Sequence, residues 1–95
     1  MTLHVVAHFQ SRPSRGRELE ALLSPLIEPT LMEDGCLAYI YYRDIADPDH
    51  FVFIEQWRDE VSLDVHLTMD HVRLMLMQVD GLLASPIEGY RLTAR

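Results

Sequence analysis

The chain has 95 residues and a mass of 11.0 kDa, the size of one small domain. It carries 8 basic and 15 acidic residues, which gives a net charge of −7, and it contains neither lysine nor asparagine. The absence of lysine excludes Schiff-base chemistry, and an acidic chain lacks the basic face of a general nucleic-acid binder. Cys36 is the single cysteine, and no apolar stretch approaches the roughly 20 residues of a membrane span. We therefore expect one cytoplasmic domain over residues 1–95 that binds neither nucleic acid nor membrane.

The first third of the chain predicts a strand followed by a helix. Residues 3–11 alternate apolar and polar side chains, as a half-buried strand does. Residues 17–33 place leucine and isoleucine at helical spacing. Pro25 and Pro29 interrupt that pattern, and because each removes a helical N–H we expect one kinked helix. Gly35 suits the position just beyond its end.

The middle of the chain predicts a long hairpin. Residues 36–44 and 50–58 both read as strands, and the turn chemistry of Asp47 and Pro48 lies between them. The alternation places Tyr39 on one face of the first of these strands and Cys36 on the other.

The last third of the chain predicts two helices and a closing strand. Asp59 can cap a short helix that carries His66, and a second helix covers residues 71–79. Gly81 ends this second helix, and residues 86–94 form the last strand.

The resulting order is β-α-β-β-α-β, which predicts a ferredoxin-like α+β domain with an antiparallel sheet and helices on one face. The two hairpin strands are apolar on both faces, although a sheet face left to water should be polar. We therefore expect a homodimer in which the two sheets pack face to face and form a dimeric α/β barrel.

Glu55 is the first candidate catalytic residue, because a carboxylate stands in the apolar row of Phe51, Phe53 and Trp57. An ionised carboxylate is costly to bury, so it must be paired, solvated or raised in pKa. The raised pKa would make it a general base. The alternative is a structural partner for Arg43, Arg91 or helix N–H groups.

His66 is the second candidate. A neutral imidazole beside an apolar cavity can abstract a phenolic or carbon-acid proton near neutral pH. Alternatively, a histidine at the end of a short helix bonds a free carbonyl. His66 and His71 are five residues apart, which differs from the i, i+4 spacing of common zinc helices, so we expect no metal here.

Three groups of residues together resemble the antibiotic biosynthesis monooxygenase domain family. They are Glu33-Asp34-Gly35-Cys36, then Ile54-Glu55-Gln56-Trp57, then His66-Leu67 followed by His71. The closest resemblance is to the small quinol monooxygenases. It implies a dimeric α/β barrel that oxidises a quinol, phenol or anthrone with O2 and uses no flavin, haem or metal cofactor.

The resemblance also implies roles for individual residues. His66 would be the catalytic base, and Glu55 would orient His66 or a water molecule. The residues expected to contact the small aromatic substrate are Trp57, Tyr39, Phe53 and Phe51. The chain departs from the aromatic-polyketide oxygenases, which have an asparagine near Phe53. It departs from haem-degrading relatives, where a histidine ligand falls near Leu76.

Two other functions remain open. The first is a non-catalytic module for small-ligand binding or dimerisation on the same fold, because a fold alone does not fix function. The second is an isomerase of a small phosphorylated signal sugar, which predicts that Arg43, Arg73 or Arg91 points into the cavity. A cavity of a few hundred Å³ with convergent polar groups favours an enzyme over a module.

Overall fold

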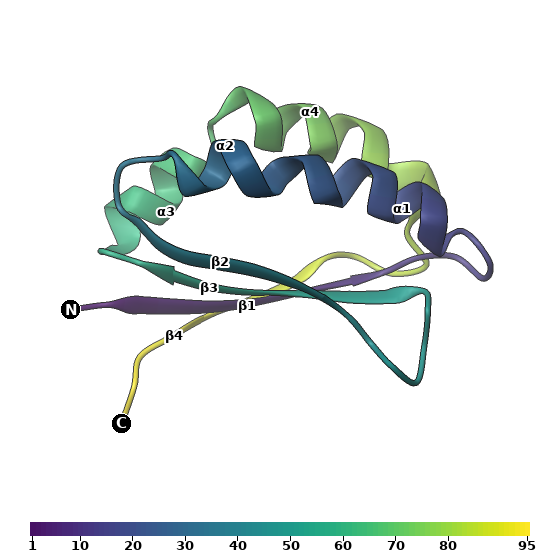
Figure 1. Ribbon diagram of the computed structural model, residues 1–95, viewed down its shortest axis with the longest axis horizontal. Coiled ribbons are helices and arrows are strands. Elements are labelled where there is room, and N and C mark those ends of the chain that lie inside the picture. The colour runs from purple at the N-terminus through teal and green to yellow at the C-terminus, as the bar shows by residue number, and fades with distance from the viewer.

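A four-stranded antiparallel sheet lies beneath a layer of helices in the computed structural model, which describes residues 1–95 (Figure 1). In chain order the elements are β1 (Leu3–Gln10), α1 (Gly16–Leu23), the 3-10 turn η1 (Ser24–Leu26), α2 (Ile27–Leu31), β2 (Cys36–Arg43), β3 (His50–Trp57), α3 (Glu60–His66), α4 (Asp70–Val79), the 3-10 turn η2 (Asp80–Leu82) and β4 (Glu88–Leu92). This confirms the predicted ferredoxin-like order.

The sheet order is β2-β3-β1-β4. Leu3 pairs with Trp57 at one end of the β1–β3 ladder, and Gln10 pairs with His50 at the other. This register sends the odd-numbered residues of both strands toward the helices, where Phe51, Phe53 and Trp57 are buried. The main core therefore lies between the sheet and the helix layer.

The kinked helix is present, and Pro25 explains where it bends. Pro25 lies in η1, the single 3-10 turn that joins α1 to α2, so its missing N–H falls at a local helix start. The three segments follow one another as an almost continuous rod across the sheet (Figure 1). The rod ends at Leu31, two residues earlier than expected.

Asp59 caps α3 as predicted, since its side chain accepts a hydrogen bond from the Ser62 backbone N–H at 2.8 Å. Both strands of the hairpin end one residue earlier than predicted, and β4 covers only residues 88–92. A β-bulge between Cys36 and Ala38 corrects the alternation in β2. Cys36 consequently packs on the core side with Tyr39, whereas Leu37 is exposed.

Gly35 makes the sharp turn into β2. Its φ of +91° lies in the left-handed region that favours glycine. A Cβ built at Gly35 would also lie 2.3 Å from Ser62 Oγ, so only glycine lets this turn pack against α3. Two positions before this turn, Glu33 reaches His66 of α3 and His71 of α4 with its side chain.

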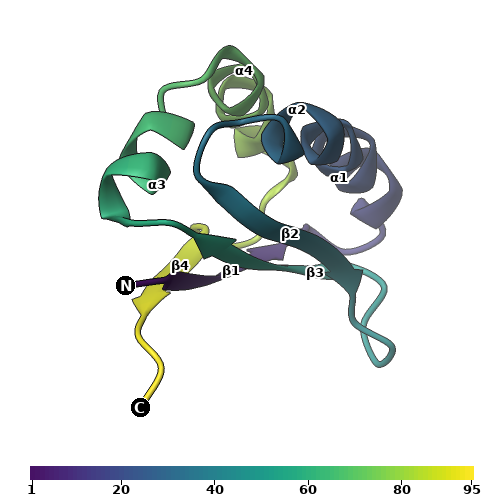
Figure 2. The same cartoon turned by 60° about the vertical axis from the view of Figure 1, so that its left-hand side comes forward.

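All helices cover one face of the sheet, and the other face carries none (Figures 1 and 2). Across that open face, Ile40, Ile54, Val6 and Tyr90 lie opposite one another and form one row over all four strands. Ile54, at the centre of the row, is 43% exposed. No helix is long and apolar enough to cross a membrane.

Candidate functional site

A cavity of about 210 Å³ lies between the sheet and the helices. Its walls are predominantly apolar, and polar side chains reach it at only a few points. The lining residues used below are Tyr39, Phe53, Glu55, His66, Gly89 and Arg91. This is the combination of an apolar space and a few convergent polar groups that typifies small-molecule sites.

The floor of the cavity follows from the sheet register. Tyr39, Glu55, Val5 and Arg91 are paired across the four strands and form one inward row. The neighbouring row contains Phe53, Ala7 and Gly89. A Cβ added at Gly89 would meet nothing within 4 Å, so the small residues leave the space above β1 and β4 empty.

Glu55 is buried in that floor, with 5% of its surface exposed. Burial raises its pKa to about 7, against the opposing effect of the hydrogen bond from Trp57. The Trp57 indole Nε1–H donates to Glu55 Oε1 at 2.8 Å. Neither Arg43 nor Arg91 pairs with Glu55, so the ion-pair interpretation does not describe this carboxyl group.

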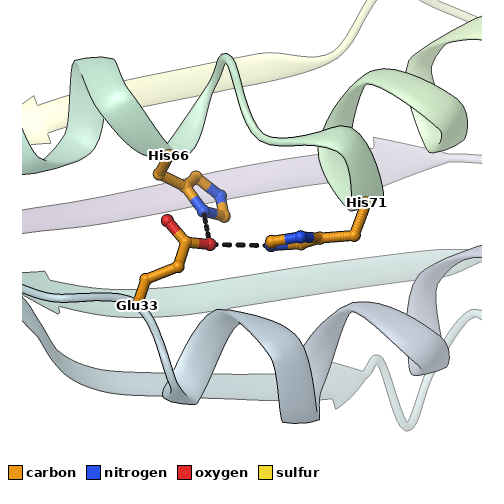
Figure 3. Close-up of side chains that lie close together, drawn as sticks. All are labelled: Glu33, His66 and His71. Carbon is orange, nitrogen blue, oxygen red and sulfur yellow. Dashed lines mark hydrogen bonds and ion pairs between the residues drawn. The ribbon is translucent and has the colours of Figure 1, made fainter.

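His66 enters the cavity from the end of α3 and is held by Glu33, which follows α2. Its Nδ1 lies 2.7 Å from Glu33 Oε2, and His71 Nε2 lies 2.7 Å from the same oxygen (Figure 3). Burial lowers the His66 pKa despite the opposing effect of Glu33, which favours the neutral imidazole. In the neutral tautomer that donates Nδ1–H to Glu33 Oε2, Nε2 is free to accept a proton.

This arrangement assigns the orienting contact to Glu33 where the sequence pointed to Glu55. The sequence also allowed His66 to bond a free backbone carbonyl at the end of its helix. The ring instead bonds the Glu33 carboxylate. Glu33 and His71 both stand in the motif that carried the family resemblance. Sequence separations of 33 and 38 residues from Glu33 to the two histidines concealed their contact.

The four predicted substrate contacts divide into two groups. Tyr39 and Phe53 line the cavity, with ring centroids 4.9 Å apart. Burial raises the Tyr39 pKa, so its hydroxyl stays protonated and can donate. Trp57 and Phe51 are fully buried and do not line the cavity. Trp57 instead supports the site from behind, with its ring centroid 4.7 Å from that of His66.

Arg91 is the only one of the three isomerase candidates in the lining. Its guanidinium lies 2.9 Å from Asp64 Oδ1 and 3.5 Å from Glu60 Oε1 at the rim. A phosphate would have to compete with both carboxylates for this one cation. Cys36 lies at the edge of the core, and burial raises its pKa to about 11, which keeps the thiol protonated.

The chain is a ferredoxin-like α+β domain with an apolar cavity between its sheet and its helices. Comparison with protein families matches residues 2–76 to the family described as antibiotic biosynthesis monooxygenase. The chain belongs to this family.

Individual relatives agree with that assignment. "Putative monooxygenase Rv0793" of Mycobacterium tuberculosis is 39% identical over 83 residues, which are 87% of this chain and 81% of the relative. "Uncharacterized protein sll1783" of Synechocystis is 32% identical over 84 residues. The match covers 88% of this chain but only 57% of that longer protein. The crystal structure of PA3566 from Pseudomonas aeruginosa superposes with a TM-score of 0.93 at 30% identity, covering 99% of this chain and 94% of that one.

The pKa of Glu55 leads to a prediction about stability and pH. A carboxyl group whose pKa rises from an ordinary 4.5 to about 7 on folding binds its proton more tightly in the folded state. The cost of its ionisation is therefore absent below pH 4.5, grows as the pH rises from 4.5 to about 7, and levels off above that. Glu55→Gln removes this titration. Relative to wild type, we expect its free energy of unfolding to increase by up to roughly 3 kcal/mol between pH 4.5 and pH 8.

Urea unfolding at a series of pH values measures this difference. Glu28→Gln, on the exposed surface of α2, is the matched control for loss of one carboxylate. A stability difference between Glu55→Gln and wild type that stays flat from pH 4.5 to pH 8 would contradict the assignment.

Proposed function

We propose that this protein is a monooxygenase that oxidises a small phenol, quinol or anthrone with O2 and no flavin, haem or metal cofactor. In the reaction a base removes the phenolic proton, and the resulting phenolate supplies electrons to O2. One oxygen atom bonds to a ring carbon, and the other leaves as water. A phenol with a free ring position is thereby converted to a quinone, and no external reductant is needed to balance the step.

The observation that carries this proposal is the position of His66 in an apolar cavity, with its Nδ1 2.7 Å from Glu33 Oε2. That contact fixes the tautomer that leaves Nε2 available as the base. When His66 accepts the proton, the Glu33 carboxylate is already in place to stabilise the imidazolium. The same contact thus serves both halves of the proton transfer.

Glu55 and Tyr39 complete the chemistry on the sheet side. Near neutral pH a substantial fraction of Glu55 is protonated, because burial raises its pKa to about 7. A protonated carboxyl group can donate to the oxygen that leaves as water, and the Tyr39 hydroxyl can hold the substrate oxygen. Phe53 offers a flat wall for an aromatic ring. The predominantly apolar lining favours an uncharged substrate over a phosphorylated one.

We also propose that the working form is a cytoplasmic homodimer. The row of Ile40, Ile54, Val6 and Tyr90 crosses the open sheet face without any covering element. Exposed contiguous apolar surface favours association, and a second copy presents the same row by symmetry. Sheet-on-sheet packing of two copies would remove both rows from water.

The activity is tested by O2 uptake with a panel of hydroquinones, naphthols and anthrones. His66→Ala should lower kcat/KM for any active substrate by about 10²–10⁴-fold, because it removes a general base. Glu28→Gln changes an exposed side chain of α2 outside the cavity lining and should leave the rate unchanged. No uptake above the uncatalysed rate would contradict the oxygenase, and binding of these compounds without turnover would favour the ligand-binding module.

Filling the cavity tests where the substrate binds. Gly89→Leu places a side chain in the empty space above β4, and we expect at least a tenfold loss of kcat/KM with little loss of stability. Gly81→Leu is the matched control, because a Cβ there also meets nothing within 4 Å but lies in η2, outside the cavity lining. Equal activity of both variants would place the reaction elsewhere.

The dimer is tested by a charge in the centre of the open face. Ile54→Glu should shift the protein to monomer in sedimentation equilibrium, because two carboxylates would be buried near one another at a symmetric interface. Val61→Glu, on the exposed surface of α3, controls for loss of an apolar side chain. A monomeric wild type, or an Ile54→Glu dimer as tight as wild type, would refute the arrangement.

A further inference from the structure

Glu33, His66 and His71 come from three different segments and converge on one point. Glu33 follows α2, His66 ends α3, and His71 lies in the first turn of α4 (Figure 3). One potential ligand atom from each residue lies within 4.8 Å of the other two. Two imidazole nitrogens and one carboxylate oxygen are a donor set that binds Zn²⁺ in enzymes and also suits other divalent first-row metals.

The Glu33 carboxylate is buried with one of its two oxygens unpaired. The Glu33 side chain is 5% exposed, and its Oε1 is buried without any hydrogen-bond partner. Its ion pairs are to the two histidines alone, and no arginine reaches it. A buried carboxylate oxygen without a partner is costly, and a cation bound beside it would remove that cost.

We propose that Glu33, His66 and His71 form a binding site for a divalent transition-metal ion, with Zn²⁺ as the ion that fits the donor set. The three ligands leave a fourth position for water. Ligands of a tetrahedral zinc ion lie about 3.3 Å apart, given bonds of about 2.0–2.1 Å, so the two contacts of 2.7 Å need to widen only modestly. Rotation of the Glu33 carboxylate, which would also bring Oε1 into use, can supply this change.

An entry route exists beside His71. Its side chain is 22% exposed and lines a surface groove between the α1–η1 segment and α4, together with Leu22, Pro25 and Leu74. A metal ion can therefore reach the three ligands from solvent without passing through the apolar cavity.

Metal binding and the base role of His66 exclude each other, an inference that rests on the proposed function. In the proposed base, the Nδ1–H of His66 donates a hydrogen bond to Glu33 and Nε2 is free. A metal ion takes the lone pair of Nδ1, so the proton of the neutral ring must reside on Nε2. His66 can then no longer accept a substrate proton, and zinc inhibits the oxidation.

A second histidine cluster supplies the control. His8 Nδ1 lies 3.0 Å from His50 Nε2, and His50 Nδ1 lies 2.9 Å from Asp44 Oδ2. This chain of contacts uses both ring nitrogens of His50, so it does not present three ligand atoms to one point. It lies on the sheet face opposite Glu33, His66 and His71.

The experiment titrates tag-free protein with ZnCl2 by calorimetry and with CoCl2 by visible absorption. The wild type should bind one ion per chain, and the cobalt spectrum should show nitrogen and oxygen ligands. Glu33→Gln and His71→Ala should each weaken zinc binding by at least about 10–100-fold, the loss typical even for residues that only support metal ligands. His50→Ala should bind as wild type does. Circular dichroism confirms that each variant is folded.

Absence of zinc binding in the wild type would overturn the proposal. So would unchanged binding in both Glu33→Gln and His71→Ala, or a loss found in His50→Ala instead. These binding results stand apart from the oxidation. O2 uptake by a protein that binds no zinc would refute the metal site alone, and zinc binding without any O2 uptake would refute the proposed reaction alone. Where both are present, added zinc should abolish O2 uptake in wild type.

Discussion

The shared oxygen of Glu33 is the contact on which the helix layer and the candidate site both depend. It receives hydrogen bonds from His66 and His71 at 2.7 Å each, and thereby ties the end of α2 to α3 and α4. These helices are short, with only 5 residues in α2 and 7 in α3, so little of their stability is intrinsic. The buried carboxylate holds them in one arrangement over the sheet. Gly35 is required nearby because the chain must turn sharply between Glu33 and β2 while packing on Ser62.

The sheet contributes the complementary half of the site through register and residue size. Pairing places Tyr39, Glu55, Val5 and Arg91 in one inward row, so polar groups from separate strands reach the same cavity. The adjacent row has the small residues Ala7 and Gly89. Larger side chains at these positions would fill the cavity, because protein interiors are closely packed. The sheet therefore positions Glu55 and Phe53, the proposed acid and substrate wall, whereas the helices position His66, the proposed base.

Local pattern made the fold predictable, and long-range contact limited what could be predicted of the site. The alternation in β1 and β3, the Asp59 cap and the kink at Pro25 each arise from neighbouring residues, and each is present. The bulge after Cys36 was missed because an added residue changes strand faces without altering composition. Trp57 shares a face with Glu55, as expected, yet the pattern could not reveal that its ring is covered and only supports the cavity. The role of Glu33 was missed because its partners, His66 and His71, are distant in sequence.

Burial shifts the pKa values of the two candidate catalytic groups, Glu55 and His66, in opposite directions. The two groups can therefore play complementary roles in proton transfer. In water at neutral pH, a glutamate is ionised and a histidine is partly protonated. Inside this cavity, burial raises the pKa of Glu55 to about 7 and lowers that of His66, so each group is driven toward its neutral form. A neutral carboxyl group is a proton donor and a neutral imidazole is a proton acceptor. One apolar environment thus favours a proton donor on the sheet and a proton acceptor on the helix layer at the same pH, which the proposed oxidation of a phenol requires.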